Sequence, residues 1–355
     1  MRTIRQDIRF TRSGDGTRIA FATAGDGYPL LKAGHWLGHL EYDWQTPVWQ
    51  PWISGLAARY RLVRFDSRGC GLSDRDVDDL SLDALVADME AVADAAGLER
   101  FALLGPSQGG AISVAYAARH PERVSHLVLV GAFARGPLRT DASPSRRAAV
   151  EAMIQLIEHG WGEANSAYLQ LFTSQFFPDA SREQRDAFNA VQRSATSPRM
   201  AARLAHAFAE LDAAAHLAQV RCPTLVLHCR GDARVPFDEG RYIAARIPDA
   251  RLEPLDSRNH FPLAGHAAFD HMLEAIAAFL PGGTVRTAAE LSLLTSRERQ
   301  ILELIARGLD NAQIAARLNL SEKTVRNNIT PIYAKLQVEN RPQAIVRARD
   351  AGLGR

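Results

Sequence analysis

The stretch LLGPSQGGA, residues 103–111, places a serine between two glycines at the end of an apolar run. Residues 100–105 have the length and composition of a buried strand, and residues 109–121 those of a helix that a proline ends. Ser107 is therefore predicted to lie on a sharp turn from strand to helix, where the flanking glycines remove side-chain clashes. On such a turn the serine hydroxyl is exposed at the carboxyl edge of the sheet and can act as a nucleophile.

A serine hydroxyl becomes an effective nucleophile only when a histidine takes its proton and an acid orients that histidine. Asp232 ends the apolar run 224–232, and His260 follows the strand-like segment 250–257. Each residue alone also fits a structural role, Asp232 as a turn or helix-capping residue and His260 as a hydrogen-bonded loop histidine. Because the order Ser, Asp, His is the one expected at the edge of such a sheet, we interpret the three as a catalytic triad.

Predicted strands and helices alternate along residues 1–280, which is typical of a mostly parallel sheet covered by helices on both faces. Residues 136–216 interrupt this alternation with helical apolar spacing and an aromatic cluster. We interpret this segment as a helical cap over the carboxyl edge of the sheet. Residues 281–290 begin with a proline and two glycines, and we interpret them as a linker to a second domain over 291–355.

Residues 1–280 resemble an α/β-hydrolase, because FDSRGCGLSD (65–74) is similar to the family's D-x-R-G-x-G-x-S segment and Ser107 lies in a G-x-S-x-G turn. The resemblance implies an α/β fold, the α/β-hydrolase fold with a helical cap. It implies that Ser107 is the nucleophile, His260 the base and Asp232 the acid. It also implies that the backbone N–H of Gln108 donates to the oxyanion.

The second oxyanion donor is expected after the strand 29–33, where the family usually has His-Gly. Here His35 occupies the position of that glycine, so the donor is expected to be the N–H of Trp36, on a backbone less free than glycine allows. Loss of one oxyanion donor typically costs ~10²–10³-fold in turnover. This departure therefore predicts a pocket that contains a triad but hydrolyses slowly.

Aromatic residues are concentrated in two parts of the chain. Four of the five tryptophans lie within residues 36–52, and the expected cap supplies three phenylalanines. One interpretation is that they wall and roof a pocket for an apolar ligand, and the other is ordinary packing of the cap against the core. The residues concerned are Trp36, Trp44, Trp49, Trp52, Phe172, Phe176 and Phe177.

The composition is that of an ordinary globular protein, with 46% hydrophobic and 23% charged residues. The first ten residues contain no apolar core of signal-peptide length, and no apolar run approaches the ~18 residues that span a membrane. The scattered Cys70, Cys222 and Cys229 argue against a disulfide framework and fit a reducing cytoplasm. Their spacing also offers no metal site. We therefore expect a cytoplasmic location and neither a metal, a cofactor nor a membrane partner.

The C-terminal segment differs in charge from the rest of the chain. Residues 286–355 hold 12 Lys and Arg against 7 Asp and Glu, a net charge of +5 in a chain whose total is +2. A basic tail on a mildly acidic body suggests that only the tail meets a polyanion. Thr295 with Glu298, and Asp310 with Gln313, have the capping-box pattern that starts helices.

A third helix is predicted after Ser321, with apolar residues on one face and Lys, Arg, Asn and Thr on the other. This helix is the second of two that a tight turn joins, and its polar face is typical of a recognition helix that enters the major groove. The solvated face of a small helical bundle is the alternative. The apolar face comprises Val325, Ile329, Ile332 and Leu336, and the polar face comprises Lys323, Arg326, Asn327 and Thr330.

Residues 291–352 resemble the LuxR-type helix-turn-helix, since LTSRERQIL, GLDNAQIAARL and SEKTVRNNI are similar to its consensus. The resemblance implies base contacts from Arg326 and Asn327, and a homodimer on double-stranded DNA through the final helix. It places the further DNA-binding residues at Lys323, Thr324, Thr330 and Lys335, with the two lysines as phosphate contacts. Asn328 and Thr330 depart from frequent residues, and Pro331 removes a backbone donor, so a distinct sequence preference is expected.

These features predict a ligand-responsive transcription regulator whose hydrolase-like domain senses a small apolar ester- or lactone-like molecule. The alternative is a catalytically active serine hydrolase, an esterase or lactonase, with a regulatory DNA-binding tail. A fully inactive scaffold is the least favoured interpretation, because nothing obvious would then hold three triad residues in place.

Overall fold

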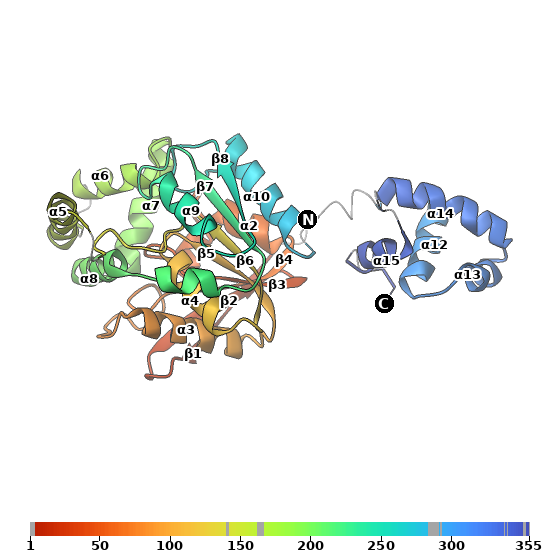
Figure 1. Ribbon diagram of the computed structural model, residues 1–355, viewed down its shortest axis with the longest axis horizontal. Helices are drawn as coiled ribbons and strands as arrows, with labels where there is room; N and C mark the ends of the chain where they lie inside the picture. The colour runs from red at the N-terminus through yellow and green to blue at the C-terminus, as the bar shows by residue number, and fades with distance from the viewer. Residues whose placement is uncertain are drawn as a thin grey trace. The chain divides into compact units, whose positions relative to one another are not determined.

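The computed structural model describes residues 4–139, 142–161, 167–282, 291, 293–336, 338, 340–350 and 353–354 (Figure 1). The chain divides into two compact units, Met1–Pro281 and Gly282–Arg355. Of the linker expected over 281–290, all but the first two residues lie outside the described residues. Across the described ranges, no helix is both long enough and apolar enough to cross a membrane.

The first unit is built on a mostly parallel sheet of eight strands. The second strand of the chain pairs antiparallel with both of its neighbours, and the remaining neighbours pair in parallel. In spatial order the strands are β1 (Gln6–Arg12), β2 (Arg18–Ala24), β4 (Tyr60–Phe65), β3 (Tyr28–Lys32), β5 (Phe101–Pro106), β6 (Val124–Val130), β7 (Thr224–Cys229) and β8 (Ala250–Leu255). Strand β4 lies between β2 and β3, so the order in the sheet differs from the order in the chain. Strand β5 lies in the middle of the sheet, with neighbours on both sides.

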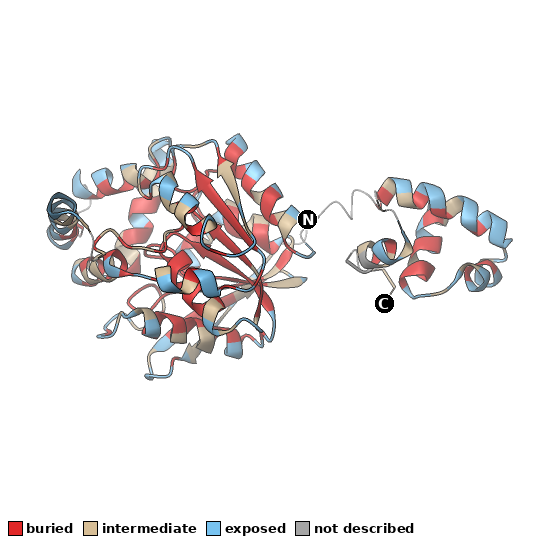
Figure 2. Ribbon diagram, viewed as in Figure 1, coloured by how far each residue is buried: buried red, intermediate tan, exposed pale blue. Residues whose placement is uncertain are grey.

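Helices lie against both faces of this sheet, as Figure 1 shows. They are α1 (Leu40–Asp43), α2 (Gln50–Ala57), α3 (Leu82–Ala95), α4 (Gly109–Arg119), α9 (Phe237–Ala244), α10 (Ala267–Phe279) and the 3₁₀ helix η1 (Ala214–Gln219). Ser81 starts α3 by accepting the N–H of Ala84. Strand β5 is buried along its whole length (Figure 2), which explains its unbroken apolar run.

The segment between β6 and β7 is helical, as predicted for a cap. It contains α5 (Pro144–Gly160), α6 (Ala167–Phe176), α7 (Arg182–Ala195) and α8 (Pro198–Glu210). Ser143, Ser181 and Ser197 each accept a backbone N–H at the start of a helix. An isolated β-bridge between Arg135 and Asp212 closes the base of this insertion.

The second unit is a small helical domain with its own core. Its helices are α12 (Ser296–Ala306), α13 (Asn311–Leu318), α14 (Glu322–Leu336) and α15 (Arg341–Asp350). Both predicted capping boxes are present, Thr295 with Glu298 and Asp310 with Gln313. The apolar face predicted for the third helix is buried at Val325, Ile329, Ile332 and Leu336.

Candidate functional site

Ser107 lies where the central strand turns into a helix. Strand β5 ends at Pro106 and α4 begins at Gly109, and the turn gives Ser107 a left-handed backbone with φ +49°. Its N–H is held by the carbonyl of Val130 at 3.0 Å. A Cβ on Gly109 would lie 2.6 Å from the carbonyl oxygen of Gly34, so this turn needs glycine for close approach of backbone. A strained serine presented in this way is the geometry that a nucleophile elbow requires.

Asp232 and His260 meet at the same edge of the sheet. His260 Nδ1 lies 2.7 Å from Asp232 Oδ2, and the other carboxylate oxygen accepts the N–H groups of Arg234 and Val235 at 2.8 and 2.9 Å. His228 Nε2 lies 3.5 Å from the same Oδ2. Burial alone would raise the pKa of Asp232, but attraction to His260 and these hydrogen bonds hold it well below its usual range. The acid is therefore charged and oriented toward the imidazole.

The imidazole of His260 packs beside the turn that carries Ser107. Val130, which binds the Ser107 N–H, is followed by Gly131 with φ +55°, where an added Cβ would lie 3.1 Å from His260 Cε1. His260 Nε2 is buried without a hydrogen-bond partner, so no bond to Ser107 Oγ is formed in this structure. Catalytic hydrogen bonds often tighten only when substrate binds. The unpartnered Nε2 is the atom that would accept a proton from the serine hydroxyl.

Two predicted oxyanion donors lie at the same cavity as Ser107. Gln108 precedes α4 and Trp36 follows β3, and both line this cavity. Within the described ranges, neither backbone N–H donates to a protein acceptor. Unpaired N–H groups at the start of a helix are what an oxyanion binds.

The sequence predicted that His35 lies beside the oxyanion donors, but its side chain does not line the cavity. Its ring stacks at 4.0 Å on Trp49, and its nitrogens face Lys32 Nζ at 2.9 Å and an Asp43 oxygen at 3.5 Å. The side chain at the expected glycine position therefore turns into the protein interior. Burial lowers the pKa of His35 well below its usual range, so the ring is neutral.

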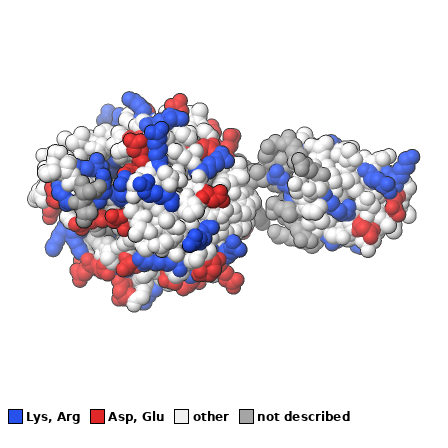
Figure 3. All heavy atoms as spheres, viewed as in Figure 1, with Lys and Arg blue, Asp and Glu red and all other residues white. Residues whose placement is uncertain are grey.

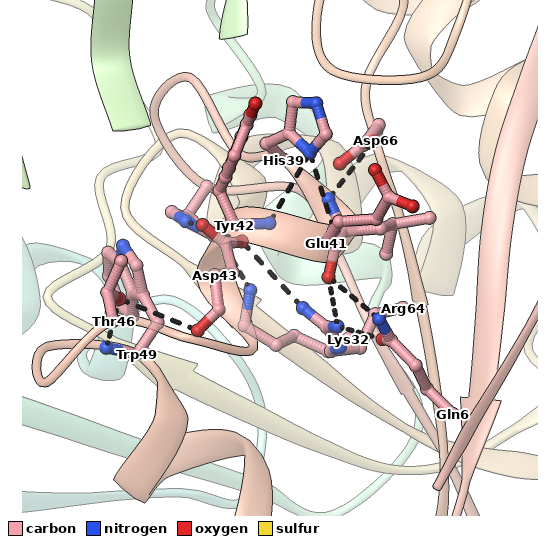
Figure 4. A network of polar contacts seen from close by, with 12 residues as sticks. Gln6, Lys32, His39, Glu41, Tyr42, Asp43, Thr46, Trp49, Arg64 and Asp66 are labelled. Carbon is pink, nitrogen blue, oxygen red and sulfur yellow. Dashed lines mark hydrogen bonds and ion pairs between the residues drawn. The ribbon is translucent and has the colours of Figure 1, made fainter. Parts of the chain in front are cut away.

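A buried charge cluster lies beside His35. Its charged members Lys32, Asp43, Arg64 and Asp66 are labelled in Figure 4. Lys32 at the end of β3 lies with Arg64 of β4 near Asp43 of α1, and Asp66 follows β4. Burial lowers the pKa of Lys32 and raises that of Asp43, with the opposite charges in the cluster partly opposing both shifts. Because Lys32 Nζ also donates to the carbonyl of Ala33, the cluster fixes the backbone just before the predicted second oxyanion donor.

The cavity over Ser107 has a volume of about 500 Å³, in the range of small-molecule sites. Its apolar walls come from the core and the cap, and the charged residues of its described lining are four arginines and one glutamate. The apolar lining includes Trp36, Phe133, Met153, Ile154, Ile157, Phe172, Phe176 and Phe208, and the charged lining comprises Arg135, Arg139, Arg146, Arg234 and Glu239. The cavity therefore suits a ligand with an apolar body.

The aromatic residues divide between the two interpretations. Trp36 lines the cavity together with Phe172 and Phe176. The ring of Phe172 contacts both Trp36 and Phe176. Trp49 and Trp52 instead pack on Phe261 in the core, and Phe177 meets Phe188 edge to face. Trp44 lies beside Arg64. Only the first group can contact a ligand over Ser107.

The polar face of α14 is exposed. Its exposed residues include Lys323, Thr324, Arg326, Asn327 and Thr330. Pro331 lies inside the helix without ending it. The visible face of the first unit mixes acidic and basic side chains (Figure 3), so the basic excess of the chain belongs to the tail.

Lys335 has a different environment from the other predicted DNA contacts. Its ammonium lies 2.8 and 2.6 Å from the two carboxylate oxygens of Glu298, which is buried and also accepts the N–H of Thr295. The hydrogen bond from Lys335 holds the pKa of Glu298 below its usual range. Lys335 is thus engaged within the domain, an arrangement that the helical pattern alone does not reveal.

Comparison with known proteins agrees with this geometry. Residues 36–270 match the model of the alpha/beta hydrolase fold, and residues 292–348 match that of bacterial regulatory proteins of the luxR family. The chain belongs to the α/β-hydrolase family, and its hydrolase domain is followed by a LuxR-type helix-turn-helix domain.

Individual relatives cover the hydrolase part. The AB hydrolase superfamily protein YisY from Bacillus subtilis is 30% identical, over 71% of this chain and 90% of its own. A 2-hydroxy-6-oxononadienedioate/2-hydroxy-6-oxononatrienedioate hydrolase from Pseudomonas putida is 31% identical, over 60% of this chain and 74% of its own. The solved enol-lactonase from Burkholderia xenovorans aligns with a TM-score of 0.60 at 20% identity, covering 76% of this chain and 99% of that one.

Two residues of the site escaped the sequence analysis. His228 lies in strand β7 and flanks the Asp232 carboxylate. Arg234, two residues after the acid, lines the cavity. A charged residue in the loop that carries the acid is the signal that would have indicated the second. Among the described residues no cluster of His, Cys, Asp and Glu could hold a metal, and the three cysteines are buried and unpaired.

Proposed function

We propose that this chain is a transcription regulator whose hydrolase-fold domain binds a small ester- or lactone-like ligand. The observation that carries the proposal is one chain that holds Ser107 at an aromatic cavity, with His260 packed beside its turn, and also a LuxR-type domain with an exposed polar recognition helix. Relatives named as hydrolases of carbonyl compounds support a carbonyl ligand. DNA as the partner makes the cytoplasm the place of action in this proposal.

In this proposal the ligand acts on DNA binding through the population of two states. A ligand changes DNA affinity only when it binds one state better than the other. The resulting coupling free energy is typically ~1–3 kcal/mol. Two copies on a two-fold symmetric operator are the simplest arrangement for a domain of this type, so the proposal includes a homodimer.

The same residues support the second candidate function, slow serine hydrolysis. Ser107 Oγ would attack the ligand carbonyl while His260 Nε2 takes its proton, with Asp232 stabilising the imidazolium. The N–H groups of Gln108 and Trp36 would bind the oxyanion. Collapse expels the alcohol, which takes the proton from His260, and water then releases the acid from Ser107. A receptor with this activity terminates its own signal.

A gel shift with operator fragments selected from random double-stranded DNA tests the regulator. We expect the full chain to select a defined site, and Arg326→Ala to lose specific binding while the hydrolase domain stays folded. Binding should weaken steeply with salt, as phosphate contacts require. A chain that selects no sequence, or an Arg326→Ala variant that binds its site unchanged, would contradict the proposal.

Intact-mass measurement after treatment with a fluorophosphonate separates the two candidate functions. An adduct on the unchanged chain that Ser107→Ala lacks supports a reactive nucleophile. Turnover of esters or lactones beyond one equivalent supports the hydrolase, whereas an adduct with little turnover, combined with changed operator affinity, supports the sensor. An inert Ser107 would exclude the hydrolase.

A further inference from the structure

Arg234 places a guanidinium in the cavity that holds Ser107. Its backbone N–H binds Asp232, which fixes the start of the side chain next to the triad. The guanidinium carbon lies 5.1 Å from the ring centre of Phe172 and 5.3 Å from that of Phe176. Its hydrogen bond is to an uncharged partner, Gln175 Oε1, at 3.3 Å. Arg234 is therefore held by aromatic faces and an amide.

No carboxylate in the described part of the chain lies within 4.0 Å of this guanidinium. Asp232 is the acid whose attraction it feels, but the oxygens of that carboxylate are bound to His260 and to backbone N–H groups. Burial lowers the pKa of Arg234 to about 10, so the group is still charged at neutral pH. Arg234 is partly buried, and a charge partly withdrawn from water without a close countercharge is costly.

The neighbouring cavity arginine shows the contrast. Arg135 lines the same cavity, and its Nη2 lies 2.7 Å from Glu239 Oε1, so its charge is compensated within the protein. Among the residues that the structure describes, Glu239 is the one acidic residue of the lining. The lining therefore carries an excess of positive charge, and Arg234 is the member of it that lies beside the triad.

We propose that the ligand of this cavity carries a carboxylate at the end remote from its reactive carbonyl, and that Arg234 binds this carboxylate. The proposal rests on the proposed function, since it names the ligand class for the same cavity. A planar guanidinium binds a carboxylate through two parallel hydrogen bonds. The apolar walls suit a hydrocarbon segment between the two ends, so the ligand is an ester or lactone of a dicarboxylic acid.

A matched pair of esters tests this assignment. The two compounds are the mono-4-nitrophenyl ester of adipic acid and the same ester with its free carboxyl methylated. Their remote end is a carboxylate in the first and a neutral methyl ester in the second. We measure the rate of nitrophenolate release, including the first-turnover burst, with the full chain. We expect the carboxylate form to acylate Ser107 about tenfold faster or more, as a desolvated charged hydrogen bond allows.

Arg234→Gln should reduce that preference to about twofold or less. Arg230→Gln is the matched control, because Arg230 is exposed, two residues before the acid, and absent from the cavity lining. It should retain the preference. Equal rates for the two esters in the unchanged chain, or a preference that survives Arg234→Gln, would overturn the assignment.

The Ser107→Ala chain gives a second measurement that needs no reaction. Its melting temperature should rise more with the charged ester than with the neutral one, and Arg234→Gln in the same background should abolish the difference. Equal shifts would also overturn the carboxylate site. A chain that binds both esters yet leaves operator affinity unchanged contradicts the sensor proposal, so the two failures are distinguishable.

Discussion

The backbone N–H of His260 donates a 2.7 Å hydrogen bond to the carbonyl oxygen of Phe176, the last residue of cap helix α6. The rings of the same two residues meet edge to face at 5.3 Å. Asn259 adds a second tie, because its side-chain oxygen accepts the N–H of Asp179. The proposed catalytic base is thus attached to the cap that covers the ligand cavity.

This attachment predicts a change in hydrogen exchange when the cavity is occupied. Labelling with a fluorophosphonate should slow exchange at the His260 amide together with amides of α6, because both ends of the shared bond become more ordered. Mass spectrometry of peptides from the full chain measures this. Ser107→Ala treated with the same reagent is the control, and protection confined to α6 would contradict the coupling.

Substitutions at Ser107 should rank in an unusual order. The left-handed backbone at φ +49° costs a residue with a Cβ about 1–2 kcal/mol and glycine almost nothing. Ser107→Gly should therefore be more stable than Ser107→Ala by about 1 kcal/mol in urea unfolding. At Ser54, inside helix α2, the ranking should reverse. Equal stability of the two Ser107 variants would argue against the strained turn.

The buried carboxyl of Asp66 should make stability depend on pH. Burial raises its pKa to about 7, although the N–H groups of Leu72 and Leu40 partly oppose this. In the unfolded chain the value is about 3.9. The folded protein therefore binds the extra proton between about pH 4 and 7, and the stability that this proton contributes is lost as the pH rises through that range.

Asp66→Asn keeps this side chain neutral at every pH. Its free energy of unfolding, relative to the unchanged chain, should rise between about pH 5 and about pH 8. Urea unfolding at the two values measures the difference. The exposed Asp256→Asn is the control for removal of one carboxylate. A difference for Asp66→Asn that stays constant with pH would contradict the assignment.

The two lysines of the tail should respond differently to substitution. Lys335→Met leaves the buried Glu298 without its cation and should lower the stability of the tail by about 1–2 kcal/mol. Lys323→Ala, at an exposed position, should leave stability unchanged but reduce the salt dependence of DNA binding by about one unit of slope. Calorimetric melting and gel shifts at several salt concentrations separate these effects. Unchanged stability of the tail in Lys335→Met would contradict this structural role and favour a DNA contact for Lys335.

Local sequence patterns predicted the elements that form the framework. The alternation of buried strands and amphipathic helices, the turn at Ser107 and the two capping boxes depend on residues close together in the chain. Asp232 and His260 were found because parallel strands end at one edge of the sheet.

Side-chain partners from distant segments were not accessible in the same way. His35 turns toward Lys32 and Asp43, and Lys335 binds a glutamate 37 residues earlier in the chain. In both cases the side chain contacts charged groups that the periodic spacing of helices and strands does not identify. The charge of Arg234 became informative only when the structure showed which acids it lacks.

Glu298 joins two helices of the tail, since it caps α12 and holds the final turn of the recognition helix α14 through Lys335. This contact ties the recognition helix to the rest of the domain. In the proposed regulator, a bound ligand would therefore act on DNA through the position and orientation of this domain as one body. The operator would then read the spacing of two such bodies, and control of transcription becomes a question of alignment rather than of local refolding.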